Sequence, residues 1–585
     1  MKTPLSVAAV ALAIALTGIR VSTQVAAVPP SMAPASELAP LVERYNQDRS
    51  LLMRRYDVGY SPERYARLNK FYKDWQQELA AVKFESLGVE GRVDDTLLRT
   101  RLEYELRLLS REQQWVAEAA SLVPFSGTIT ALLDARGRFE SMDATRTATT
   151  LDRLAKEIEA ATKTLDSGPR AATAATVADP ARARQINAYR AAEILTSLRT
   201  DLTAWDRFYT GYDPLFTWWA AKPYAQVDKA LAAYIKALRE KIVGYREGED
   251  EPIIGNPVGK GALEADLASE FIPYSPEELL AVAEREFAWC DREMLRASRD
   301  MGFGDDWRAA LEKVKTLHVE PGRQTDLVRD LAREAIGYVK QRDLVTVPAL
   351  ADETFRMTMM SPERQKVNPF FLGGEVIQVS YPTDGMDQDD KLMSMRGNNI
   401  HFSRSTVFHE LIPGHWLQQF MTARFNSHRR AFATPFWTEG WSLYWEMLLW
   451  DDGFPKTPEN RVGMLFWRMH RCARIIFSLR FHLGTMTPQE CIDFLVDRVG
   501  HERANAEAEV RRSFNGTYPP LYQLAYMMGG LQFRAMHAEL VKTGKMSNRQ
   551  FHDAILQSGS MPVEMVRAAI TKQLLPPGFK TAWKF

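Results

Sequence analysis

The segment with the sequence HELIPGH, residues 409–415, constrains the fold most strongly, because it places two histidines six positions apart. Each residue of a regular α-helix advances by about 100°, so six positions carry the second imidazole roughly 240° around the axis, onto a different face. Pro413 has no N–H to donate to the carbonyl of His409, and Gly414 can adopt backbone dihedrals that other residues avoid. We therefore predict a break at Pro413-Gly414 that brings His415 back toward His409.

The residues around this break are typical of a hydrolytic zinc site. In the H-E-x-x-H motif, two histidines bind the metal and the glutamate acts as general base. Here Glu410 follows the first histidine, and a later carboxylate, Glu439, follows His415 at the distance found in zinc peptidases of the gluzincin type. The alternative is that these are ordinary core or surface residues, since the chain contains 10 histidines. The later carboxylate favours the metal site.

The pairing of HExxPGH with EGWxxYxE, residues 439–446, resembles the bacterial domain-of-unknown-function family numbered 885. Members of that family look like gluzincin metallopeptidases. The resemblance implies a mainly α-helical, two-lobed fold, with His409, His415 and Glu439 as Zn²⁺ ligands and Glu410 as general base. It covers most of the chain loosely, and its specific motifs lie between about residues 398 and 530.

The C-terminal part of the family pattern, Q-x-x-x-Y-x-x-G, matches less well. Tyr526 and Gly529 fit, but Tyr522 occupies the position of the glutamine, and Gln523 is one residue late. Attack of water on a carbonyl creates a negative oxygen that needs a hydrogen-bond donor. Tyr526 is our first candidate for this catalytic role, and Tyr522, one helical turn earlier, is the rival. Either side chain could instead be a core tyrosine.

The helix that contains Glu439 offers further candidates. Glu446 follows Glu439 by seven residues and is expected near the same face, where it could accept the second N–H of a ligating histidine or pair with an arginine. Trp437, Trp441 and Trp445 recur every fourth residue, which favours packing over contact with substrate.

Size and charge agree with a large enzyme. With 585 residues, 45% of them hydrophobic, the chain can bury one very large core or two packed lobes. The 74 basic residues balance 74 acidic ones, so the charge does not indicate nucleic acid as a partner. We expect zinc-dependent hydrolysis of a peptide substrate. A zinc amidohydrolase acting on a non-peptide or cell-wall amide, and a catalytically degenerate peptide-binding protein, stay open as alternatives.

The N-terminus has the pattern of an export signal, with Lys2, an apolar run from Leu5 to Leu16 and small residues at 25–27. We predict a signal peptide over residues 1–27 and a periplasmic or secreted protein without a stable membrane anchor. An uncleaved anchor is the alternative.

Three cysteines are too few for a disulfide scaffold in an exported protein of this size. Cys472 and Cys491 could bridge neighbouring helices, but buried free thiols are favoured.

Helical patterns dominate the chain. Apolar residues recur with helical spacing from 227 to 245, and the segments SPEE (275–278) and TPQE (487–490) each offer an N-cap, a proline and an acid that begin a helix. Strand patterns occur at 375–381 and 399–403. They predict a small sheet beside the metal-site helix, which either binds an extended peptide at its edge or only covers the core.

We expect two lobes, a helical lobe over residues 36–345 and a catalytic lobe with the zinc motif over residues 346–585.

Overall fold

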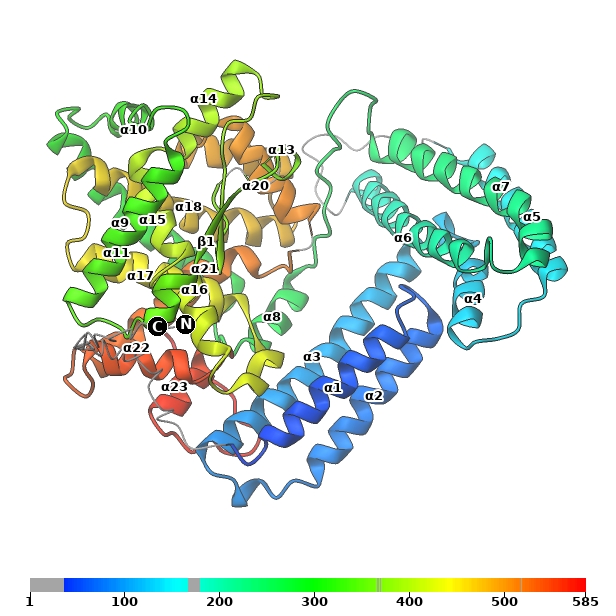
Figure 1. The fold of residues 1–585 in the computed structure, drawn as a ribbon, viewed down its shortest axis with the longest axis horizontal. Helices are drawn as coiled ribbons and strands as arrows, with labels where there is room; N and C mark the ends of the chain where they lie inside the picture. The colour runs from blue at the N-terminus through cyan, green and yellow to red at the C-terminus, as the bar shows by residue number, and fades with distance from the viewer. Residues whose placement is uncertain (1–35, 167–178, 366–367, 369, 517) are drawn as a thin grey trace, which may run out of the picture.

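The computed structural model describes residues 36–166, 179–365, 368, 370–516 and 518–585. The predicted signal peptide lies outside these residues. The described chain is mainly α-helical with one small two-stranded sheet, as predicted (Figure 1). None of its helices is long and apolar enough to cross a membrane.

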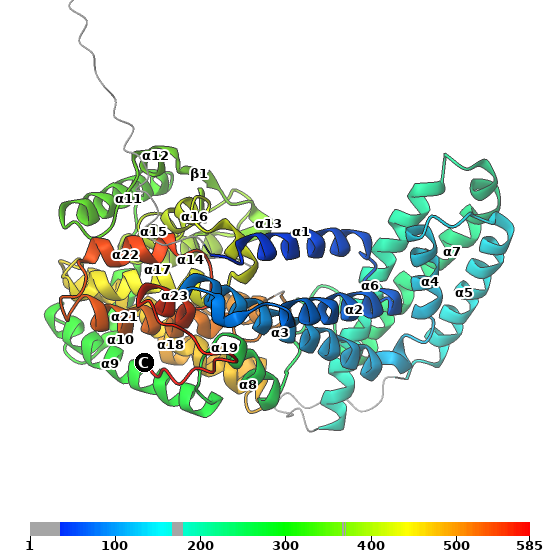
Figure 2. The same cartoon turned by 90° about the horizontal axis from the view of Figure 1, so that it is seen from below.

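The N-terminal helices form an extended arm. Three long helices run from the main body toward a separate bundle of four helices (Figure 2). The three long helices are α1 (Ala39–Arg55), α2 (Pro62–Ala80) and α3 (Val89–Ala119). The bundle consists of α4 (Ser126–Gly137), α5 (Ala144–Thr164), α6 (Pro180–Tyr209) and α7 (Pro214–Leu238).

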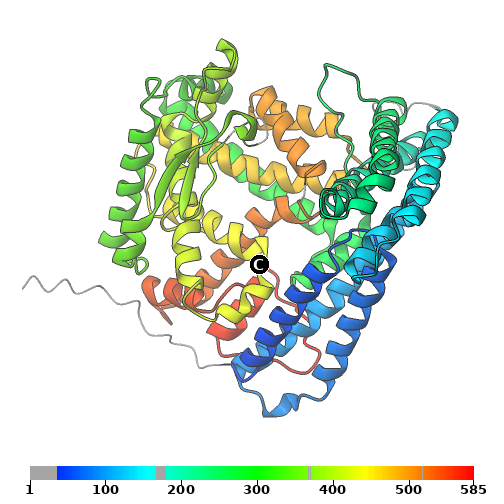
Figure 3. The same ribbon diagram turned by 45° about the vertical axis from the view of Figure 1, so that its right-hand side comes forward.

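The remaining helices form the main body, which faces the arm across the molecule (Figure 3). Its first part comprises α8 (Lys260–Ser269), α9 (Pro276–Asp300), α10 (Trp307–Lys315), α11 (Gln324–Gln341), α12 (Ala349–Thr354), α13 (Pro362–Gln365) and α14 (Gln388–Gly397). Its second part comprises α15 (Ile400–Glu410), α16 (His415–Thr422), α17 (Pro435–Asp451), α18 (Pro458–His482), α19 (Pro488–Phe494), α20 (Arg503–Phe514), α21 (Tyr522–Leu540), α22 (Asn548–Gln557) and α23 (Val563–Ile570).

Local sequence signals account for several helix boundaries. Ser275 and Thr487 each form a capping box with the acid three residues later, and each precedes a proline at the first position of α9 or α19. The predicted helical segment 227–245 lies mostly in α7, which continues as a π-helical turn over Arg239–Val243. Gly244 ends that turn with φ of 96°, a left-handed conformation that glycine adopts without steric cost.

The small sheet confirms one of the two predicted strands. β1 (Arg356–Met359) pairs in parallel with β2 (Val376–Val379), which lies inside the predicted segment 375–381. The predicted strand at 399–403 is wrong, because this segment begins α15. The side chain of Asn399 caps that helix by accepting hydrogen bonds from the backbone N–H groups of His401 and Phe402, both at 3.0 Å.

Buried apolar side chains form two clusters in the described residues. One lies mostly within the bundle α4–α7 and includes residues next to it, among them Val58, Ala119 at the end of α3, and Ile254. The other joins α1–α3 to the main body, from Val42 to Leu575. The boundary between these two clusters does not coincide with residue 345. The division into lobes over residues 36–345 and 346–585 stays a prediction.

Ion pairs fasten α3 to the main body. Arg429, buried after α16, donates to Asp94 at 2.7 Å and to Glu90 at 2.6 Å. Arg111 pairs with Asp266 of α8 at 2.6 Å. The first part of the predicted helical lobe is therefore bonded directly to the part of the chain that holds HELIPGH.

All three cysteines are buried free thiols, as favoured from the sequence. Cys491 contacts the carbonyl of Phe477 rather than the thiol of Cys472, so the predicted alternative of a bridge between these two is not formed.

Candidate metal centre

The predicted helix break is present between α15 and α16. Residues 411–414 separate the two helices, so that His409 lies in the last turn of α15 and His415 begins α16. Trp441 of α17 donates to the carbonyl of Pro413 at 2.9 Å, which fixes the connection. A Cβ atom on Gly414 would overlap the carbonyl oxygen of His409, so only glycine fits there.

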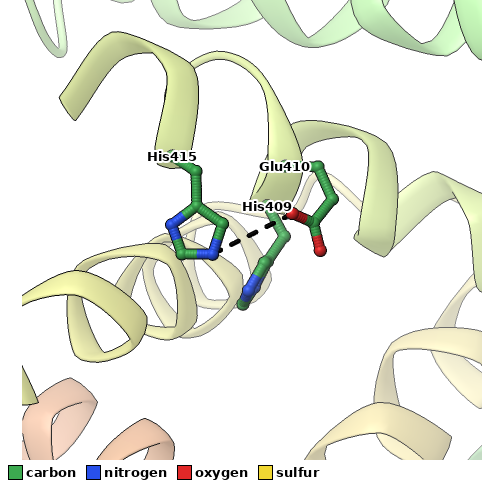
Figure 4. Close-up of side chains that lie close together, drawn as sticks. All are labelled: His409, Glu410 and His415. Atoms are coloured by element: carbon green, nitrogen blue, oxygen red, sulfur yellow. Dashed lines mark ion pairs between the residues drawn. The ribbon is translucent and has the colours of Figure 1, made fainter. Parts of the chain in front are cut away.

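The break brings the predicted ligands together. The His409 and His415 rings lie 4.8 Å apart, centre to centre, and are nearly perpendicular. Glu439 Oε2 lies 3.1 Å from His415 Nε2 and 3.6 Å from His409 Nε2. Figure 4 shows the carboxylate of Glu410 directed toward His415, and the two are 3.9 Å apart.

The separations suit a shared metal ion. Two atoms that each lie about 2.0–2.1 Å from a tetrahedral zinc are about 3.3 Å apart, close to both distances from Glu439 Oε2. That oxygen is buried and accepts no hydrogen bond from the described residues. Two imidazole nitrogens and a carboxylate oxygen are ligands that zinc prefers, so the residues fit this metal.

Neighbouring side chains orient both imidazoles. His409 Nδ1 donates to Glu446 Oε1 at 2.7 Å, whereas Arg471 lies 3.7 Å from the same oxygen. Of the two partners predicted for Glu446, a ligating histidine and an arginine, the histidine forms the hydrogen bond. Ser442 Oγ donates to the carbonyl of His409 at 3.0 Å and lies 3.1 Å from His415 Nδ1, whose N–H it can accept. Both Nε2 atoms are left free to bind a metal.

Close contact between α17 and α21 positions the other side of the site. A Cβ on Gly440 would overlap the backbone of Gly529, and a Cβ on Gly529 would overlap the carbonyl of Phe436. These glycines let the two helices approach at the backbone. The approach places Glu439, next to Gly440, beside the tyrosines of α21.

Charge and burial set the ionisation of the two glutamates. Burial opposes the charged form of Glu439, but the neighbouring imidazoles of His415 and His409 hold its pKa well below the usual value. Burial raises the pKa of Glu410, which strengthens it as a proton acceptor. The Glu410 side chain keeps 13% of its surface exposed, so water can reach it.

Gly373 and Gly374, which are not among the predicted site residues, also contact Glu410. Gly374 N donates to the carbonyl of Glu410 at 3.2 Å, and a Cβ on Gly373 would overlap the Glu410 carboxylate. The Gly-Gly pair before β2 therefore lets this segment lie against the C-terminal end of α15, where Glu410 is located. A Gly-Gly pair ahead of a predicted strand is a signal of close backbone approach that was available in the sequence.

The structure places both candidate tyrosines beside the cluster. Tyr522 OH donates to Glu439 Oε1 at 2.6 Å. The Tyr526 ring lies parallel to His409 at 6.2 Å and contacts Arg471 and Arg474 with its face. The choice between them as donor to the reaction's negative oxygen stays a prediction.

Trp437, Trp441 and Trp445 are buried, which confirms that they pack in the core.

Comparison with known proteins places the chain in a family. Residues 48–570 match the family described as "Bacterial protein of unknown function (DUF885)". A comparison with curated proteins gives no match. The fold is similar to that of a candidate lipoprotein of unknown function from Shewanella oneidensis, with a TM-score of 0.67 and 18% identity over 92% of this chain and 100% of that one.

A second solved structure has the same fold. It is a candidate lipoprotein from Colwellia psychrerythraea, with a TM-score of 0.57 and 16% identity over 92% of this chain and 98% of that one. At such identities the likeness shows the fold alone. The family match spans most of the chain, so the chain belongs to the DUF885 family of bacterial proteins.

Proposed function

We propose that this protein is an exported zinc-dependent metallopeptidase. The observation that carries the proposal is the convergence of His409, His415 and Glu439 on one point, with the Glu410 carboxylate beside it. The description of two similar structures as candidate lipoproteins supports export to the cell envelope.

The residues divide the chemistry among them. A bound zinc ion polarises a carbonyl and lowers the pKa of water to about 7. Glu410 accepts the proton of the attacking water and then donates it to the departing amine. Glu446 and Ser442 hold the imidazoles in the tautomer that binds metal. A tyrosine of α21 donates a hydrogen bond to the negative oxygen formed on the carbonyl.

Digestion of a peptide library with and without a chelator tests the proposal. Activity should be lost with the chelator and return with zinc. Glu410→Gln should keep zinc and fold but lose about 10²- to 10⁴-fold in turnover, because glutamine cannot accept the proton.

Glu564→Gln is the matched control, since it makes the same change at a buried carboxyl in α23, outside the predicted ligands, and should leave activity unchanged. A zinc-loaded wild type that cleaves no peptide, or an unimpaired Glu410→Gln variant, would contradict the proposal.

A further inference from the structure

Three arginines gather next to the candidate metal centre. Arg471 and Arg474 of α18 place their guanidinium carbons 4.5 and 4.4 Å from the centre of the Tyr526 ring. Arg512 of α20 lies 5.7 Å from the ring of Tyr518. Arg512 and Tyr518 are half-buried, so this row of cations extends from the buried metal site toward the surface.

The row has fewer acidic partners than cations. Glu509, completely buried, accepts from Arg474 Nε at 2.6 Å and pairs with Arg512 at 2.6 Å. Arg471 forms no hydrogen bond within the described parts of the chain. Its nearest acid, Glu446, is 3.7 Å away and already accepts a hydrogen bond from His409.

The missing partners leave donors without acceptors. Arg471 Nε, Arg474 Nη1 and Arg512 Nε are buried and lack hydrogen bonds to the residues described. Burial and the charge of Arg474 also lower the pKa of Arg471, the expected result when a buried cation has a like-charged neighbour and too little counter-charge. Buried cations that share too few acids and keep donors without acceptors are costly, so an anionic ligand would stabilise this arrangement.

We propose that Arg471, assisted by Arg474, binds the C-terminal carboxylate of the peptide substrate. The inference rests on the proposed peptidase function and deepens it, because it makes the enzyme one that acts at the C-terminal end of peptides. The planar guanidinium group matches a carboxylate with two parallel hydrogen bonds.

The spacing fits this role. The Arg471 guanidinium lies 4.5 Å and the His409 imidazole 6.2 Å from the centre of the Tyr526 ring, so at most the sum of these distances separates the cation from a metal ligand. An extended chain covers about 3.3–3.6 Å per residue. At most about three residues therefore span the gap between the attacked carbonyl and the terminal carboxylate.

Pairs of peptides that differ only in a free or an amidated C-terminus test the proposal on the zinc-loaded full chain. The free acids should be cleaved with kcat/KM about 10- to 100-fold higher, mostly through KM, as expected for charge-assisted hydrogen bonds. Arg471→Gln should abolish this preference, and Arg471→Lys should restore part of it. Arg468→Gln is the matched control, since Arg468 lies one turn earlier in α18 and pairs with Glu286. It should keep the preference.

Binding gives a readout that does not need turnover. In the Glu410→Gln background, calorimetry should show tighter binding of the free acid than of the amide, and Arg471→Gln should remove the difference while zinc content stays constant.

The outcomes separate the two proposals. Equal cleavage by the wild type of peptides with a free and an amidated C-terminus would overturn the carboxylate site and leave the peptidase proposal intact. Cleavage that depends only on internal Asp or Glu residues of the peptide would have the same consequence. An equal loss on both peptides in Arg471→Gln would show that Arg471 acts only through Glu446, which also overturns the site. Preferential binding of free acids that depends on Arg471, without any hydrolysis, would support the site and overturn the peptidase.

Discussion

Replacing Glu446 by glutamine tests how the protein holds its metal ligands. Glu446 Oε1 accepts the Nδ1–H of His409 at 2.7 Å, and both side chains are buried. Glutamine has nearly the same volume and can still accept this proton, but it carries no charge. Hydrogen bonds to charged groups contribute about 1.5–3 kcal/mol and neutral ones about 1 kcal/mol.

The expected loss in zinc binding is therefore about 0.5–2 kcal/mol, or about 2- to 30-fold in affinity. The upper part of this range overlaps the roughly 10- to 100-fold losses typical of residues that orient metal ligands. Ser442→Ala removes a neutral hydrogen bond to His415 and should cost about 1 kcal/mol, or roughly 5-fold.

Competition titration against a fluorescent zinc chelator at constant pH measures these losses. Glu90→Gln is the control, because Glu90 is also buried and bound to Arg429, far along the chain from the ligands. It should lower stability but not zinc affinity. A zinc affinity of Glu446→Gln equal to that of wild type, or an equal loss in Glu90→Gln, would show that Glu446 does not support metal binding through His409.

Three further predictions concern the break, the tyrosines and acid stability. Gly414→Ala should lower zinc content and melting temperature together, because its Cβ would overlap the His409 carbonyl; metal analysis and thermal unfolding measure both. Tyr526→Phe should lower kcat more than it raises KM while zinc stays bound, and finding this effect in Tyr522→Phe instead would reassign the donor. Stability in denaturant titrations should fall by up to about 4 kcal/mol per pH unit as pH drops from about 6 toward 3, since three buried histidines bind protons near pH 6.5 only when unfolded. These histidines are His482, His501 and His552, and burial lowers the pKa of each to about 3 in the folded protein.

The sequence predicted features whose causes are local. The proline and glycine after Ile412 disfavour a continuous helix through their own backbones, and the caps at Ser275 and Thr487 act on their own first turns. The strand expected at 399–403 failed because a short apolar segment fits both helix and strand, and the cap formed by Asn399 decided for helix.

Features made by distant parts of the chain were not accessible in this way. Ser442 contacts His415 because α17 packs on α16, and Arg471 reaches Tyr526 from a different helix. Nothing in the spacing of these residues encodes those contacts, since they depend on the packing of whole helices. Gly373 combines both cases. The Gly-Gly pair before the strand indicates a close approach of two backbones, but the sequence does not tell that the segment approached is Glu410.

Anomalous diffraction at the zinc absorption edge, from crystals of the full chain, shows directly whether zinc binds at HELIPGH and Glu439. We expect one zinc ion per chain, bound by His409 Nε2, His415 Nε2 and a carboxylate oxygen of Glu439, and absent from crystals of His415→Ala. A zinc ion held by other residues, or crystals of fully active protein without metal at this position, would contradict this expectation.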